Sequence, residues 1–216
     1  MSREVLTTGL QRLGLSLSES QVTQLLDYLA LLQKWNKVYN LTAVRNPGEM
    51  MTHHLLDSLA AIAPLLRQTA GEPIKLLDVG SGGGLPGVVI AIVCPQIDVS
   101  CVDTVGKKAA FIQQAAATLK LPNLRGVHAR VETLTAEQGG GFDVVCSRAF
   151  ASLVDFTTWS RAALKAGGVW MAMKGKHPEE ELAALPNDVA VFHVEQLQVP
   201  GLDAERCIIW MRPLAG

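Results

Sequence analysis

The spacing of apolar residues changes at about residue 73 of this chain. Before that point apolar side chains recur every three or four positions, as on one face of a helix. Ser18 and Gln21 form a capping-box sequence, and Asn46–Pro47 marks a break. We expect a helical extension over residues 1–72 that packs on the rest of the chain, with helices over about 5–13, 19–39 and 50–66.

From Ile74 onward short apolar runs alternate with helical patterns, which is typical of a parallel β-sheet covered by helices. The runs predict strands over 74–79, 97–103, 124–129, 142–147 and 168–174. The segments between them predict helices over 85–94, 107–120 and 155–165, and a turn at Gly139–Gly141. No helix separates the last two strands, near 189–199 and 206–212, so we expect an antiparallel hairpin at the sheet edge. Residues 73–216 are therefore expected to form one mostly parallel α/β domain with an antiparallel terminal strand.

A glycine-rich turn joins the first predicted strand to the next predicted helix. Gly80, Gly82 and Gly84 alternate there, and an acid, Asp78, stands two residues before the first of them. Glycine allows positive φ and lets a ligand approach the backbone without meeting a Cβ atom. Free N–H groups at a helix start favour polar or anionic ligand groups. A strand, a glycine turn and a helix in this order open a nucleotide-binding α/β domain.

Two acids indicate which nucleotide this is. A carboxylate at Asp78 disfavours a nearby pyrophosphate and favours the sulfonium and α-ammonium groups of S-adenosylmethionine. Asp103 ends the second strand, roughly 20 residues beyond the glycine loop, where a carboxylate commonly binds ribose hydroxyls. The same spacing occurs in NAD enzymes, so it is Asp78 that favours S-adenosylmethionine. The alternative is that Asp78 only caps the following helix.

The composition is that of a globular protein without a strong bulk charge. The 216 residues are 49% hydrophobic and 18% charged, with a formal net charge of −1, so any nucleic-acid-binding surface must be a local patch. The sequence has no signal-peptide pattern and no apolar run that could span a membrane, and we expect a cytoplasmic monomer. No His or Cys cluster has zinc-like spacing, so no metal is expected. The cysteines are predicted to be buried thiols: Cys94, Cys101, Cys146 and Cys207.

Four separated segments resemble, in the same order, those of one protein family. They are Lys34–Thr42 (KWNKVYNLT), His54–Leu59 (HLLDSL), Asp78–Gly87 (DVGSGGGLPG) and Ser147–Ala151 (SRAFA). Nearly from end to end the chain is similar to the RsmG (GidB) family of bacterial 16S rRNA guanine-N7 methyltransferases. The resemblance implies a class I S-adenosylmethionine-dependent methyltransferase fold, Rossmann-like, acting on guanine 527 in the 530 loop of 16S rRNA. The implied partner is 16S rRNA or the small ribosomal subunit.

The resemblance also implies where the cofactor binds. The implied contacts are Gly80, Leu85, Val131, Glu132 and Arg148, in addition to Asp78, Gly82, Gly84 and Asp103. Glu132 follows the third strand, where this fold usually places the adenine. One position departs from the family, because the residue before His54 is usually arginine and here is His53. Any contact of that residue with RNA phosphate becomes weaker and pH-dependent.

Guanine N7 presents a lone pair and carries no proton, so in-line methyl transfer to it needs alignment and no general base. The Pro-Pro-aromatic signature of amino-methyltransferases is absent after the fourth strand. Arg148 is the predicted catalytic residue, since a guanidinium tethered by a carboxylate can donate to guanine O6 beside N7. The alternative for Arg148 is a structural ion pair. Phe150 is expected either to stack on the guanine or to pack in the core.

Basic residues near the strand carboxyl ends, or in the helical extension, are candidates for RNA contacts. They are Arg45, His53, His54, Lys107, Lys108, Arg130, Lys174, Lys176 and His177, whereas Arg125 lies away from that edge. His54 and Asp57 are expected to form a hydrogen-bonded structural pair rather than a metal site. Trp35 and Tyr39 are expected in the core rather than as a platform for bases.

Three other functions stay open. The chain could methylate a small molecule or a protein, whose binding would show little salt dependence. It could be a non-catalytic ribosome-assembly factor, although Asp78, the glycine loop, Asp103 and Arg148 are all retained. It could be a dehydrogenase, which Asp78 and the terminal hairpin disfavour.

Overall fold

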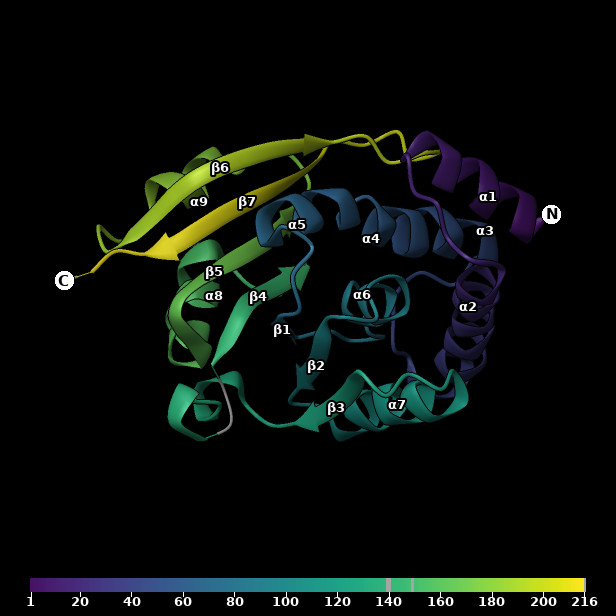
Figure 1. The fold of residues 1–216 in the computed structure, drawn as a ribbon, viewed down its shortest axis with the longest axis horizontal. Coiled ribbons are helices and arrows are strands. Elements are labelled where there is room, and N and C mark those ends of the chain that lie inside the picture. The colour runs from purple at the N-terminus through teal and green to yellow at the C-terminus, as the bar shows by residue number, and fades with distance from the viewer. Residues whose placement is uncertain (139–140, 149, 216) are drawn as a thin grey trace.

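The computed structural model describes residues 1–138, 141–148 and 150–215. Within these ranges seven strands form one mixed sheet in the order β3-β2-β1-β4-β5-β7-β6 (Figure 1). The strands are β1 (Lys75–Val79), β2 (Asp98–Asp103), β3 (Leu124–His128), β4 (Phe142–Arg148), β5 (Leu164–Lys174), β6 (Val189–Leu197) and β7 (Arg206–Pro213). Strands β1 to β5 run parallel, and β7 pairs antiparallel with both β5 and β6. The predicted sheet is therefore confirmed, with β6 at the edge and β7 one place inside it.

Helices cover both faces of this sheet. They are α6 (Gly87–Val93), α7 (Gly106–Thr118), α8 (Leu153–Ser160) and α9 (Glu179–Ala183), with short 3-10 turns η2 (Val131–Thr133), η3 (Ala136–Gln138) and η4 (Arg161–Ala163). Neighbouring residues of a strand enter different apolar clusters. In β1, Leu76 packs with residues of α6 and α7, whereas Leu77 packs with residues of α8. Burial on both faces explains why these strands read as continuous apolar runs.

Several predicted boundaries were wrong by a few residues. The helix predicted over 85–94 begins at Gly87, because the preceding residues complete the glycine turn. The helix predicted over 155–165 begins at Leu153, because the Ser152 hydroxyl caps it by accepting from the Asp155 N–H (3.1 Å). The strand predicted over 168–174 extends back to Leu164.

One predicted turn falls partly outside the described residues. Gly139 and Gly140 lie in that gap, whereas Gly141 is described and has a φ of 82°. A positive φ of this size is one that glycine adopts readily and other residues rarely adopt. The glycine at position 141 thus suits the turn that leads into β4.

The first part of the chain is helical, as predicted. Its helices are α1 (Ser2–Arg12), α2 (Glu19–Tyr39), α3 (Pro47–Met50), the π-helical η1 (Met51–Leu56), α4 (Asp57–Leu59) and α5 (Ile62–Thr69). The capping box is present: the Ser18 hydroxyl accepts from the Gln21 N–H (3.1 Å), and Gln21 Oε1 accepts from the Ser18 N–H (3.0 Å). Asn46–Pro47 does not break the chain before a later helix but begins α3, with Asn46 as its cap. No helix in the described ranges is long and apolar enough to cross a bilayer.

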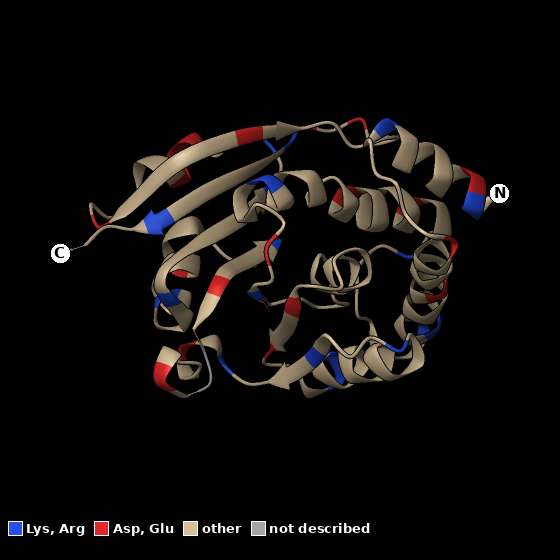
Figure 2. Ribbon diagram, viewed as in Figure 1, with Lys and Arg blue, Asp and Glu red and all other residues tan. Residues whose placement is uncertain are grey.

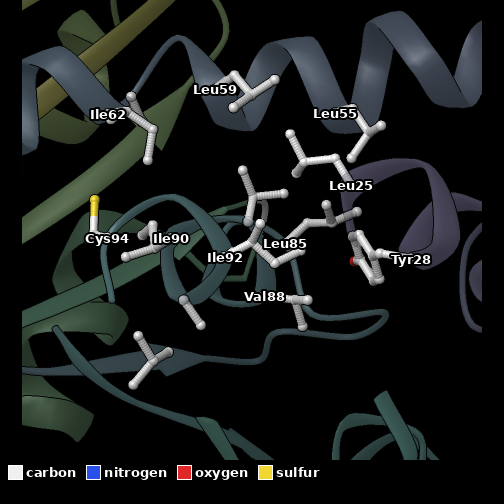
Figure 3. Close-up of a cluster of buried hydrophobic side chains, with 14 of the residues drawn as sticks. Leu25, Tyr28, Leu55, Leu59, Ile62, Leu85, Val88, Ile90, Ile92 and Cys94 are labelled. Atoms are coloured by element: carbon white, nitrogen blue, oxygen red, sulfur yellow. The ribbon is translucent and has the colours of Figure 1, made fainter. Parts of the chain in front are cut away.

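These N-terminal helices share one apolar core with the sheet domain. Leu25 and Tyr28 of α2 belong to one apolar cluster with side chains of α4, α5 and α6 (Figure 3). The Gln21 side chain also donates to the carbonyls of Ile92 and Val93 at the end of α6 (3.2 Å each), and Gln24 donates to the carbonyl of Leu119 after α7 (2.8 Å). Helix α2 thus satisfies backbone groups that the ends of α6 and α7 leave open. The division of the chain at residue 72 stays a prediction.

Helix α2 also fixes the glycine loop from behind. The buried Tyr28 hydroxyl donates to the carbonyl oxygen of Gly83 (2.6 Å). A Cβ atom at Gly83 would lie 2.7 Å from Leu32 Cδ1, so the loop backbone touches the helix directly. The loop therefore depends on α2 for its position.

We expect Tyr28→Phe to lower the free energy of unfolding by about 1–3 kcal/mol, because the buried Gly83 carbonyl loses its hydrogen bond. Tyr39→Phe, which removes the hydroxyl from an exposed ring, is the matched control and should change stability by less than about 0.5 kcal/mol. Urea unfolding of both variants measures the difference. Equal effects would show that the Tyr28 hydroxyl does not hold the loop.

Candidate functional site

A cavity of about 490 Å³ opens where β1, β2 and β3 end. Its walls come from the ends of β1 and β2, the first turn of α7, the segment Ala129–Glu132 after β3, and the rings of Phe150 and Trp159. Gly80, Asp103, Val131 and Glu132, which the sequence analysis placed in one cofactor site, all lie in this lining. Parallel strands that end together at a sheet edge are the usual place for such a site.

Asp103 joins the cavity to the glycine loop. Its Oδ2 accepts from the Gly82 N–H (3.2 Å), and its Oδ1 accepts from the Val105 N–H (2.9 Å). Each carboxylate oxygen has a second lone pair that can accept from another donor. Asp103 therefore holds the loop and the start of α7 while it can still bind hydroxyl groups in the cavity.

The three alternating glycines are required for different reasons. Gly80 has a φ of 64°, and a Cβ atom there would collide with the Phe150 ring. Gly82 has a φ of 57°, and its Cβ position is open except for the Leu41 carbonyl oxygen at 3.6 Å. A Cβ atom at Gly84 would collide with Val88 and Ile112, so this glycine serves helix packing. Of the three, Gly82 has an open Cβ position, whereas side chains occupy the corresponding space at Gly80 and Gly84.

The carboxyl group of Asp78 is completely buried beneath the glycine loop. Its Oδ2 accepts from the Gly87 N–H at the start of α6 (2.8 Å), so the capping alternative is realised. Its Oδ1 is buried without a hydrogen-bond partner among the described residues, and the Cys146 thiol nearby is only a weak donor. Burial raises the pKa of Asp78 to about 8, although the bond to Gly87 and the charge of Arg148 oppose this. Asp78 is not among the residues that line the cavity, so its free oxygen lies beneath the loop and not at the cavity surface.

Arg148, at the end of β4, is held by the N-terminal helices. Its Nη1 donates to Asp57 Oδ2 (3.1 Å) and to the carbonyl oxygen of His53 (2.6 Å), and its Nη2 donates to His54 Nδ1 (3.0 Å). The carboxylate tether expected for Arg148 is therefore Asp57. Among the described residues, these bonds use three of the five N–H groups of the guanidinium.

Asp57 is 1% exposed and binds a second arginine, Arg206 of β7. Arg206 Nε donates to Asp57 Oδ1 (2.6 Å) and its Nη2 donates to Oδ2 (3.0 Å). Sequence reasoning missed Arg206 entirely. It stands 149 residues from Asp57, and nothing in the sequence around it indicates a partner.

His54 is buried within the same network, which corrects the prediction that it contacts RNA. Burial, followed by the charge of Arg148, lowers the pKa of His54 to about 4. Because Arg148 can only donate, Nδ1 of the neutral ring is the acceptor and Nε2 carries the proton. Nε2 lies 2.7 Å from the Thr42 hydroxyl, which fixes the other side of the ring. His54 and Asp57 do not pair directly as expected but are bridged by Arg148.

The other predicted RNA contacts fall into two groups. Lys174 is half-buried, with its ammonium on the Ala151 carbonyl (2.9 Å) and Glu181 Oε1 (3.1 Å), so it fixes the segment after β4 instead of facing RNA. Lys108 lines the cavity wall, as does Arg130, and Phe150 lies there edge-on to Trp159 with ring centroids 5.9 Å apart. The other exposed candidates are Arg45, His53, Lys107, Lys176 and His177. Figure 2 shows that Lys and Arg occur around much of the molecule, including α2 and α7.

No group of three or more His, Cys, Asp or Glu residues that could hold a metal ion occurs in the described part of the chain. The four cysteines are buried and unpaired, as predicted. Burial raises the pKa of the Cys94 thiol to about 11, which disfavours a thiolate.

Comparison with known proteins identifies the family. A family profile described as GidB, rRNA small subunit methyltransferase G, matches residues 21–209. The ribosomal RNA small subunit methyltransferase G of Acidovorax sp. (strain JS42) is 70% identical over 218 residues, which cover 97% of this chain and 95% of that protein. This chain belongs to the rRNA small subunit methyltransferase G (GidB) family. The relative of the same name from Polaromonas sp. (strain JS666 / ATCC BAA-500) is 71% identical, with 96% of this chain and 92% of that protein covered.

Solved structures agree on the fold of this GidB-family protein. A SAM dependent methyltransferase from Aquifex aeolicus matches it with a TM-score of 0.56 at 16% identity, over 83% of this chain and 97% of that chain. The sheet order and the antiparallel β7 complete the comparison. The predicted class I methyltransferase fold is confirmed.

The buried His54 makes stability depend on pH. The unfolded chain binds a proton at this ring near pH 6.5, whereas the folded protein does so only near pH 4. Stability is therefore lost as the pH falls through this window, by roughly 3 kcal/mol for His54 alone. Urea unfolding of the wild type and of His54→Gln at pH 7 and pH 4 should show that the wild type loses about this much more than the variant.

The comparison with His54→Gln is needed because Asp78 makes stability depend on pH in the opposite direction. Because its pKa is raised in the folded protein, Asp78 stabilises the folded state at low pH. This contribution to the free energy of unfolding falls as the pH rises toward 8, in the wild type and in His54→Gln alike. Parallel stability profiles for the two proteins would show that His54 is not held neutral.

Proposed function

We propose that this protein transfers a methyl group from S-adenosylmethionine to N7 of a guanine in the 530 loop of 16S rRNA. The observation that carries the proposal is the buried Asp78 oxygen without a partner among the described residues, beside the Asp103 cavity, in a member of the rRNA small subunit methyltransferase G family. Burial makes the ionised form of Asp78 costly, and a cationic ligand nearby would favour that form.

The residues around the cavity fit S-adenosylmethionine. Asp103 has lone pairs free for ribose hydroxyls, and Val131 and Glu132 form the wall that would face the adenine. Asp78 Oδ1 would accept from the ammonium of the amino-acid part, which would approach past the open Cβ position at Gly82. The bound cofactor supplies a methyl group on a positively charged sulfur. The acids of this chain thus favour a cation, which NAD does not offer at that end.

We assign to Arg148 the role of orienting the guanine that accepts the methyl group. Asp57, His53 and His54 hold the guanidinium in one orientation, and its two remaining N–H groups can donate to guanine O6. Holding the guanine ring through O6 in this way would align its N7 lone pair for an in-line displacement. No proton has to leave N7, so no residue has to act as a base. The neutral His54 is already committed on both nitrogens and is not available for that task.

Basic side chains near this edge would hold the RNA backbone. Lys107 and Lys108 stand on the first turn of α7, and Arg45 and His53 stand in the N-terminal extension. Lys176 follows β5 on an exposed segment. Contacts of this kind position RNA without reading its sequence.

The proposal is tested by mass mapping of 16S rRNA after incubation of small subunits, from a strain lacking this protein, with the purified protein and S-adenosylmethionine. A methyl group on guanine 527 is expected. Arg148→Lys should slow the reaction roughly 100-fold or more, because an ammonium cannot keep the planar contacts of the guanidinium. Arg161→Lys, which alters an exposed ion pair with Asp188, is the matched control.

Two results would contradict the proposal. One is the absence of methyl transfer to the 530 loop. The other is a tenfold rise in the single-turnover rate per pH unit between about pH 6.5 and 9, since this would require a general base.

Cofactor affinity should depend on pH through Asp78. Below about pH 8 its carboxyl group is protonated in the free protein, and a bound ammonium would favour the ionised form. Binding should release a proton, and affinity should rise between about pH 6 and 8 by up to tenfold per pH unit. Calorimetry in buffers of different ionisation enthalpy measures both effects. Asp78→Asn should remove the pH dependence and weaken binding, and a wild type that releases no proton would contradict the role of Asp78.

A further inference from the structure

Tyr39, the last residue of α2, is an exposed aromatic residue near the cavity. It is 40% exposed, so the expectation that it lies in the core was wrong. Half-buried Trp35, one turn earlier, packs against it with ring centroids 5.2 Å apart and in turn contacts the buried ring of Phe111 (5.4 Å). Tyr39 thus has a rigid aromatic support on one side and solvent on the other.

A lysine covers part of this ring. The Lys107 Nζ lies 5.4 Å from the centroid of the Tyr39 ring, and Lys107 is itself exposed. An exposed ammonium is held only weakly over an aromatic ring, whereas a stacked nucleic-acid base is held more strongly. A base that stacks on Tyr39 can therefore displace the Lys107 ammonium from the ring. The displaced ammonium can then pair with a phosphate.

Short connections link Tyr39 to the site already described. The Leu41 carbonyl oxygen borders the open position at Gly82, and the Thr42 hydroxyl lies 2.7 Å from His54 Nε2, whose ring holds Arg148. Three residues of chain span at most roughly 10 Å, about the length of three stacked nucleotides. On the other side, Val105 and Lys108 line the cavity while Lys107, between them, reaches Tyr39.

We propose that Tyr39 is a stacking platform for an unpaired RNA base within a few nucleotides of the methyl acceptor, and that Lys107 moves from its ring to the adjoining phosphate. The inference rests on the proposed function and adds a substrate contact to it. The charges around the ring favour this occupant, because Lys37 and Arg45 are exposed on the neighbouring chain segments. Single-stranded RNA presents bases and phosphates together, which is what an aromatic ring beside lysines binds.

Binding of deproteinised 16S rRNA to the variants Tyr39→Phe, Tyr39→Leu and Tyr39→Ala tests the platform. The phenyl ring should keep the affinity within about twofold of wild type, whereas leucine and alanine should weaken it by about tenfold or more. Leucine keeps an apolar contact with Trp35, so a purely structural role would be rescued by Leu as well as by Phe. Equal affinities of the Tyr39→Phe and Tyr39→Leu variants would therefore overturn the platform. Affinity for S-adenosylmethionine, measured by calorimetry, should not change in any of the three.

Lys107→Ala should lower the slope of log affinity against log salt by about one unit, because one phosphate contact is lost. Lys120→Ala, just beyond the far end of the same helix, is the matched control and should leave the slope unchanged. An unchanged slope in Lys107→Ala would overturn the proposed move to a phosphate. The binding assay needs no methyl transfer, so a wild type that binds 16S rRNA through Tyr39 but does not methylate it would sink the proposed function alone.

Discussion

The structure depends most on the buried carboxylate of Asp57, which binds the guanidinium groups of Arg148 and Arg206. Removing these charges from water is costly, and only their close mutual geometry compensates for it. Loss of Asp57 would leave two guanidinium groups without their carboxylate, whereas loss of either arginine would leave one ion pair in place. The network therefore fixes three parts of the chain against each other: the helical region around η1, the end of β4 and the start of β7. The N-terminal helices are in this way part of the site that orients Arg148.

The same helices control the glycine loop. Tyr28 and Leu32 of α2 hold Gly83 from behind, while Asp103 binds the Gly82 N–H from the cavity side. Asp78, beneath the loop, divides its two oxygens between a helix cap and an open position. The cap of α6 and the proposed contact with the cofactor ammonium are therefore compatible, since they use different oxygens of one carboxylate. Its burial makes the open oxygen a strong acceptor only when a positive charge is near.

Local sequence patterns were enough to predict most of the helices and strands of this protein. The capping box, the glycine turn and the alternation of apolar runs with helical patterns are local signals, because each depends on residues a few positions apart. They predicted the N-terminal helices, the parallel strands and the reversed last strand. Asp78 and Asp103 were identifiable because strand ends of a parallel sheet meet at one edge, whatever packs around them. The family resemblance added Arg148, Val131 and Glu132 as predicted cofactor contacts.

Only the tertiary structure decided which side chains meet and which stay in water. Arg206 was invisible in the sequence because its partner lies 149 residues away and the pairing exists only once β7 enters the sheet. His54 and Lys174 were both candidates for RNA contacts, yet packing buries His54 and pairs Lys174 with Glu181. Tyr39 was predicted to lie in the core, yet α2 ends at this residue and leaves its ring partly exposed beside Lys107. Burial and long-range pairing depend on how the elements pack together, and the periodicity of a segment contains no record of its neighbours in space.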